Sequence, residues 1–161
     1  MTNPHEFIQG EFTRTLDERF RLSVPTELAE PLSAAGAECI LVKERPGCLS
    51  LWPAGIWRQQ LAAGIAVVES KIRAGKLQAQ LEEVQTLGRL LSTRHRTVQL
   101  AGRGRLSIPE GFREFLQVEP GADAVVVGAA VCVEIWQPAA WVAHLETRLP
   151  EFGRLFSQLS S

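Results

Sequence analysis

Two short segments of this chain carry arginines whose type and spacing could do chemistry. Arg19 and Arg21 open the segment RFRLSVP, which ends at Pro25, and Arg103 and Arg105 open RGRLSIP, which ends at Pro109. A guanidinium group makes charge-assisted, bidentate hydrogen bonds to phosphate oxygens and to the O6 and N7 atoms of guanine. The two segments therefore indicate one polyanion-binding feature that occurs twice.

The recurrence extends well beyond these segments. At a constant offset of 84, residues 12–61 and 96–145 share 14 identities in 50 aligned pairs, with no insertion or deletion. Uncommon residues recur among them: Pro25 and Pro109, Cys48 and Cys132, Trp52 and Trp136, and Trp57 and Trp141. Similarity at a fixed offset indicates a duplicated structural unit. Two copies are too few for a solenoid.

Positive charge is concentrated in the second copy. Residues 94–109 hold four arginines and no acidic residue, whereas residues 12–25 hold three arginines with Asp17 and Glu18. The whole chain has a formal net charge of −1, which argues against a general polyanion binder. A basic run is most often a solvated surface. Here the arginines recur at matched positions, which favours a role beyond solvation; Arg14, Arg94 and Arg96 flank them.

Alternating apolar and polar residues predict a strand, a turn and a second strand at the start of each copy. In the outgoing strand, Leu22 and Leu106 face a core while the neighbouring arginines and serines face outward. We expect Asp17 to shape the first turn, and Gly102 and Gly104 to permit positive φ in the second. Each proline then begins a short helix, and a β-hairpin follows. The predicted fold class is therefore α+β, built from two tandem β-turn-β-α-β-β units with flanking helices.

Helical periodicity predicts further helices outside the copies. The spacing of leucines and valines indicates helices over about 54–73 and 77–93, and an apolar-faced helix after Pro150. That C-terminal face either packs internally or joins subunits. We divide the chain into repeat 1 (9–55), a helical connector (56–92), repeat 2 (93–139) and a C-terminal helical segment (140–161).

Composition places the chain among ordinary globular proteins and offers little support for an enzyme. There is no apolar run long enough to cross a membrane and no signal-like start in residues 1–6, and three cysteines suggest reduced thiols in the cytoplasm. His5, His95 and His144 lack metal-ligand spacing, and the glycines near Arg103 are not followed by a phosphate-loop lysine. We expect no catalytic residue, no metal, no cofactor, no membrane and no small-molecule substrate.

The duplicated motif resembles the MraZ family of bacterial transcriptional regulators. The resemblance covers about residues 9–145 and rests on two copies of a strand, a D-x-x-x-R turn, R-L-S-V/I-P and a downstream C-L-x-L-W-P stretch. It implies tandem SpoVT/AbrB-type domains, a swapped-hairpin barrel formed by both halves, and self-assembly into rings. It also implies binding to promoter repeats of the division and cell-wall gene cluster, with repression as the expected outcome and the nucleoid as the location.

Family members present DNA-facing arginines in the D-x-x-x-R segments, which here correspond to Asp17 with Arg21 and to Arg105. The chain departs from the usual D-x-x-G-R turn at two positions. Phe20 stands where glycine is expected, so the first turn either changes type or carries strain. Ala101 replaces the aspartate of the second copy, which leaves that turn without an acidic residue. We infer that the second copy provides more of the phosphate attraction.

These observations assign a role to each arginine. Arg21 and Arg105 are the candidate base readers, Arg19 and Arg103 contact phosphates or bases, and Arg14, Arg94 and Arg96 are flanking phosphate contacts. One ribbon makes few phosphate contacts, so the physics favours a homo-oligomer on repeated sites. In the alternative, the protein is a structural ring former whose arginines contact Asp17, Glu18 or a neighbouring subunit.

Overall fold

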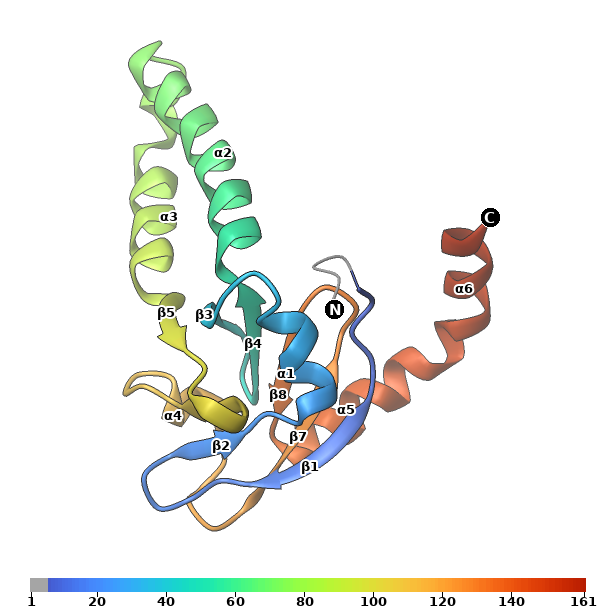
Figure 1. Ribbon diagram of the computed structural model, residues 1–161. Coiled ribbons are helices and arrows are strands. Elements are labelled where there is room, and N and C mark those ends of the chain that lie inside the picture. Colours follow the sequence, from blue (N-terminus) through green and yellow to red (C-terminus); the bar gives the residue numbers. More distant parts are fainter. Residues whose placement is uncertain (1–5) are drawn as a thin grey trace.

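The computed structural model describes residues 6–161, and Figure 1 shows their arrangement. The expectation about a secretion signal rests partly on residues 1–5, which lie outside the described residues. Each repeat contains strands, one short helix and a hairpin, in the predicted order. The first repeat comprises β1 (Glu11–Thr15), β2 (Arg21–Ser23), α1 (Thr26–Leu32), β3 (Glu38–Arg45) and β4 (Cys48–Pro53). The second comprises β5 (His95–Gln99), β6 (Arg105–Ser107), α4 (Arg113–Leu116), β7 (Asp123–Gly128) and β8 (Val133–Trp136).

The two repeats exchange strands and so build one structure. Six antiparallel strands form a sheet in the order β1-β7-β8-β4-β3-β5, and β2 pairs with β6 in a separate two-stranded ribbon. Strand β1 of repeat 1 therefore pairs with β7 of repeat 2, and β5 of repeat 2 pairs with β3 of repeat 1. The α+β prediction is confirmed.

The expected barrel does not close. Within residues 6–161, β1 and β5 lie at opposite edges of an open sheet and do not pair with each other. Each edge strand is followed by a turn and then by a strand of the ribbon, so β1 leads to β2 and β5 leads to β6. The segments that follow the two edge strands thus meet through the pairing of β2 with β6, while the edge strands themselves stay apart.

A shared apolar core fixes the ribbon against the sheet. Leu22 and Leu106 lie opposite each other in the ribbon and are fully buried, as are Leu41 and Leu49 in the central hairpin of repeat 1. Burying a leucine side chain contributes about 1.5–3 kcal/mol relative to leaving it exposed. Because residues of both repeats enter this one cluster, displacing the ribbon would expose core from both halves.

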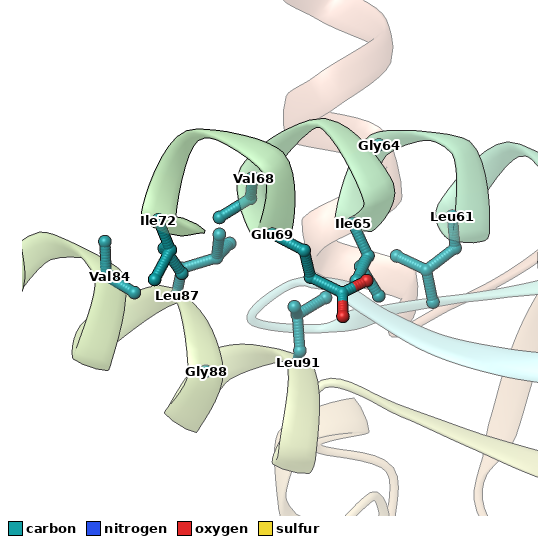
Figure 2. A pocket seen from close by; sticks show the side chains of 10 residues that line it. All are labelled: Leu61, Gly64, Ile65, Val68, Glu69, Ile72, Val84, Leu87, Gly88 and Leu91. Atoms are coloured by element: carbon teal, nitrogen blue, oxygen red, sulfur yellow. The ribbon is translucent and has the colours of Figure 1, made fainter. Parts of the chain in front are cut away.

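The connector forms a helical hairpin that projects from the sheet (Figure 1). It consists of α2 (Ala54–Arg73), a short 3₁₀ turn (Gln78–Gln80) and α3 (Leu81–Thr93). The prediction of a helix over 54–73 is confirmed, whereas regular α-helix begins at Leu81 rather than at Leu77. Between the helices lies an apolar groove of about 440 Å³, shown in Figure 2, whose one charged lining residue is Glu69.

The C-terminal segment continues away from the sheet on the other side of the view (Figure 1). Helix α5 (Pro138–Arg148) begins where the Gln137 side chain accepts a hydrogen bond from the Ala140 N–H, and α6 (Phe152–Ser160) follows a single 3₁₀ turn. The apolar residues of α6 are exposed: Phe152, Leu155, Phe156 and Leu159. Of the two roles considered for this face, internal packing is therefore excluded in the single chain.

Candidate nucleic-acid interface

The ribbon joins the two matched arginine segments directly. Three residue pairs make up the ribbon: Arg21–Ser107, Leu22–Leu106 and Ser23–Arg105. Side chains alternate between the faces of a strand, so both leucines point into the core while the arginines and serines lie on the opposite face. Arg21 and Arg105 are consequently diagonal neighbours on one surface, although 84 positions separate them in the chain.

Antiparallel pairing also fixes where the remaining two arginines lie. Each turn immediately precedes its strand, so the turn holding Arg19 lies at one end of the ribbon and the turn holding Arg103 lies at the other. The Phe20 carbonyl accepts a hydrogen bond from the Ile108 N–H, and the equivalent Gly104 carbonyl accepts one from Val24, both at 2.8 Å. Pseudo-twofold symmetry thus places the four arginines along the ribbon in the order 19, 21, 105 and 103.

The Asp17 carboxylate organises the first turn. One oxygen accepts hydrogen bonds from the backbone N–H groups of Arg19 (2.8 Å) and Arg21 (2.9 Å), and the other accepts one from Arg21 Nε (2.8 Å). The bond from the Arg21 N–H is the main reason that the pKa of Asp17 lies below its usual value. Asp17 therefore shapes the turn and sets the direction of the Arg21 side chain, which stays half-exposed.

Phe20 occupies a left-handed conformation, with φ of 57°. A bulky residue adopts this region at a cost of about 1–2 kcal/mol, because its Cβ crowds the backbone. The sequence left open whether a phenylalanine at this position changes the turn type or strains the turn; the φ of Phe20 shows that the turn is strained. The guanidinium group of Arg113 lies over the Phe20 ring, with 4.4 Å between its central carbon and the ring centroid.

The second turn has the same backbone hydrogen bonds without the carboxylate. The Ala101 N–H donates to the Arg105 carbonyl at 2.9 Å, as the Asp17 N–H does to Arg21 at 3.0 Å. Two consecutive residues are left-handed here, Arg103 with φ of 65° and Gly104 with φ of 71°. Gly102 does not use the conformational freedom that the sequence suggested for it. This turn depends on Gly104, because a Cβ there would lie 2.4 Å from the Val24 carbonyl oxygen.

A polar depression of about 300 Å³ lies on the ribbon surface, lined by Thr15, Asp17, Arg21, Leu22, Ser23 and Arg105. Arg19, Arg103 and Arg105 are exposed. Within residues 6–161, the ion pairs include Arg21 but none of these three arginines. The depression thus presents guanidinium donors from both repeats to any anion that approaches the ribbon.

The three flanking arginines lie outside this depression. Arg94 donates to the Lys43 carbonyl (3.0 Å) and to the Glu44 carboxylate (3.3 Å) at the end of β5 away from the turn. Arg14 lies on the opposite face of β1 from Thr15 and donates to a neighbouring carbonyl, while Arg96 lies over the Phe112 ring. Two of the seven candidate arginines, Arg21 and Arg105, therefore line the depression. Arg19 and Arg103 lie in the turns at the two ends of the ribbon, and the other three lie elsewhere.

Sequence reasoning missed three residues close to these arginines. Thr15 lines the depression, Arg113 covers Phe20, and the Lys43 Nζ lies 4.9 Å from the Phe112 ring centroid, on which Arg96 also lies. The duplication gave no indication of two of them, because Lys43 aligns with a valine and Arg113 with an alanine. Only the tertiary structure places Lys43 and Arg113 next to aromatic rings.

Groups suited to other chemistry lie elsewhere. His95 packs on Trp57 and His144 on Trp136, and burial lowers the pKa of both imidazoles. The cysteines are buried, and burial raises the pKa of Cys39 to about 11, which keeps this thiol protonated at neutral pH. In the described part of the chain, no three His, Cys, Asp or Glu side chains cluster as metal ligands. No helix of residues 6–161 has the length and apolar content to span a bilayer.

Comparison with known proteins identifies the family of this chain. The family model described as "MraZ protein, putative antitoxin-like" matches residues 93–153. A protein named transcriptional regulator MraZ from Desulfitobacterium hafniense (strain DSM 10664 / DCB-2) is 33% identical over 135 residues, 84% of each chain. The chain belongs to the MraZ family. A relative of the same name from Roseiflexus castenholzii is 30% identical over 132 residues, which is 82% of each chain. Another, from Limosilactobacillus reuteri (strain DSM 20016), is 29% identical over 153 residues, which is 95% of this chain and 97% of the relative.

Membership of the MraZ family covers both repeats. The alignments span at least four-fifths of the chain, whereas the family model matches repeat 2 and the segment after it. Repeat 2 carries the glycine turn at Gly104, and repeat 1 carries the unusual Phe20. The two repeats of this family member therefore differ in how their turns are built.

Proposed function

We propose that this protein is a transcriptional regulator that binds double-stranded promoter DNA through the β2–β6 ribbon. One observation supports this most strongly: the ribbon aligns guanidinium groups from both repeats on one exposed face over a rigid, shared core. Relatives over most of the chain bear the name transcriptional regulator MraZ. A two-stranded ribbon fits the major groove of B-DNA, where arginine recognises guanine.

Each arginine has a role in this proposal. Arg21 and Arg105, at the centre of the ribbon, read bases, while Arg19 and Arg103, at its ends, contact phosphates or further bases. Arg14, Arg94 and Arg96 provide weaker flanking phosphate contacts, because their side chains are directed to carbonyls, Glu44 or aromatic rings. Asp17 makes no DNA contact, since a carboxylate next to phosphate is repelled.

The working form in this proposal is a homo-oligomer, arranged as a ring on repeated sites. A ribbon with four central arginines neutralises few phosphates, so one subunit alone binds weakly at physiological salt. Linked subunits on repeated sites gain affinity through effective concentration. The exposed apolar face of α6 supports self-association. The proposed target is the promoter of the division and cell-wall gene cluster, repressed by a protein located in the cytoplasm at the nucleoid.

A gel-shift series with DNA from upstream of the protein's own gene tests the proposal. We expect specific binding that weakens steeply as salt rises, because binding releases counterions from the DNA and this release is less favourable at higher salt. Scrambled DNA of the same length and composition is the control. In the competing interpretation the arginines hold subunits together. Equal affinity for both DNAs, or loss of the oligomer on mutation of the ribbon arginines, would favour that interpretation.

A further inference from the structure

We propose that Arg113 is a positioning residue for the first arginine turn, acting through Phe20 on Arg19 and Arg21. This inference rests on the DNA-binding role proposed above for the ribbon. It starts from a conflict at Phe20, a bulky side chain in a left-handed conformation at the position between the two arginines. Such a residue persists only where its surroundings hold it in place.

Three contacts hold it, and together they form a closed cycle. The Phe20 carbonyl accepts a hydrogen bond from the Ile108 N–H at 2.8 Å. The Ile108 carbonyl accepts one from Arg113 Nε, also at 2.8 Å. The Arg113 guanidinium carbon then lies 4.4 Å from the Phe20 ring centroid, which is cation–π geometry. The backbone and the ring of Phe20 are therefore both fixed by residues of repeat 2.

The equivalent place in the second turn shows that this device is specific to the first. Gly104 aligns with Phe20, and Ala29 aligns with Arg113. A Cβ on Gly104 would lie 3.3 Å from the Ala29 Cβ, so a small pair fills the same location that a large pair fills in the first turn. In both turns the helix of one repeat packs against the turn of the other. The large residues Phe20 and Arg113 thus contact each other in the first turn, and the small residues Gly104 and Ala29 occupy the equivalent positions in the second.

Arg113 is available for this role because no acidic side chain among residues 6–161 forms an ion pair with it. The Arg113 side chain is half-buried, and it contacts the Ile108 carbonyl and the Phe20 ring. Releasing the ring would let the turn leave its strained conformation. The Arg19 and Arg21 side chains would then lose the direction that fits them to DNA.

A test measures promoter-DNA affinity by fluorescence anisotropy for Arg113→Ala, Phe20→Gly and the double variant. Because glycine adopts the left-handed conformation without a covering group, Arg113→Ala should weaken binding about threefold to tenfold in the native chain and leave it unchanged beside Phe20→Gly. Arg89→Ala, at an exposed position of α3 with no ion pair among residues 6–161, is the control for loss of one positive charge. Arg113→Lys, which keeps the cation, should recover part of the affinity and serves if the alanine variant fails to fold.

The remaining outcomes separate this inference from the proposed function. An equal loss in both backgrounds would mean that Arg113 contacts DNA itself, and would overturn the positioning role. A fall in melting temperature with unchanged affinity would reduce Arg113 to a structural residue and also overturn it. If the unmodified protein fails to discriminate promoter from scrambled DNA, the proposed function falls first and this inference falls with it.

Discussion

The two arginine turns share a backbone hydrogen-bond pattern but are stabilised differently. In the first turn the Asp17 carboxylate binds two backbone N–H groups and the Arg21 side chain, and Arg113 covers the strained Phe20. In the second, Gly104 takes the left-handed conformation without strain, Arg103 beside it is also left-handed, and Arg105 has no acidic partner among residues 6–161. Duplication has thus preserved the backbone hydrogen bonds of the turn, while its backbone conformation and the side chains that stabilise it have diverged. Arg21 is therefore held by Asp17, whereas Arg105 is freer to bind an anion.

The largest effect should follow removal of the second turn's arginines. Arg103→Ala with Arg105→Ala should reduce promoter affinity about 100-fold, since each specific arginine contact is worth about 1–3 kcal/mol. Anisotropy titrations at physiological salt measure the loss. Both side chains are exposed, so the melting temperature should not change. Arg73→Ala with Arg89→Ala removes the same charge from the exposed surface of α2 and α3 as a control. Undiminished affinity in the ribbon variant would refute the assignment.

The next effect concerns the backbone of the second turn. Gly104→Ala should lower the free energy of unfolding by about 2 kcal/mol, because φ of 71° is unfavourable for alanine and its Cβ would meet the Val24 carbonyl. Gly102→Ala is the matched control, since open space surrounds that position and its φ is not left-handed. Chemical denaturation measures both variants. Similar losses in the two would show that the turn does not depend on Gly104 in this way.

Removal of the first turn's arginines should have a smaller effect on DNA binding than removal of the second turn's. We expect Arg19→Ala with Arg21→Ala to weaken promoter affinity about 10-fold, because Arg21 is already shared with Asp17 and gains less from a DNA contact. The same titration ranks the two double variants. Equal losses would contradict the conclusion that the second turn dominates.

Adding the missing carboxylate should make the second turn resemble the first. In Ala101→Asp, the new side chain can accept from the N–H groups of Arg103 and Arg105 and pair with the Arg105 guanidinium. Promoter affinity should fall about threefold while thermal stability rises slightly. Ala101→Asn, which keeps the turn-forming oxygen without the charge, separates the two effects. An increase in affinity would mean that the direction of Arg105 matters more than its availability.

The smallest effect is the pH dependence of the first turn. The pKa of Asp17 is lowered in the folded chain, so its contribution to stability is complete above the usual carboxyl value, about 3.9, and is lost as pH falls through the folded-state value. The difference in melting temperature between the unmodified protein and Asp17→Asn should therefore shrink as pH falls below about 4. A difference that stays constant down to pH 2 would contradict this account.

Local patterns predicted much of this fold because they depend on neighbouring residues. Alternation around Leu22 and Leu106 gave the ribbon strands and their buried face, and the helix over 54–73 followed from its periodicity. The strain at Phe20 could be anticipated because a phenylalanine stands where the turn motif has glycine. The swapped-hairpin barrel that the resemblance implies does not close in residues 6–161, because closure depends on whether two edge strands meet, and no local pattern specifies that.

The sequence by itself determined the duplication, the α+β class, the arginine turns and the departures at positions 20 and 101, all of which depend on residue types at fixed spacing. Only the tertiary structure decided that β2 pairs with β6, which brings Arg21 and Arg105 onto one face and places Arg113 over Phe20. The pairing of β2 with β6 joins residues more than 80 positions apart. Such contacts arise from burial of a core shared by both repeats, and the spacing of residues along one chain does not specify them.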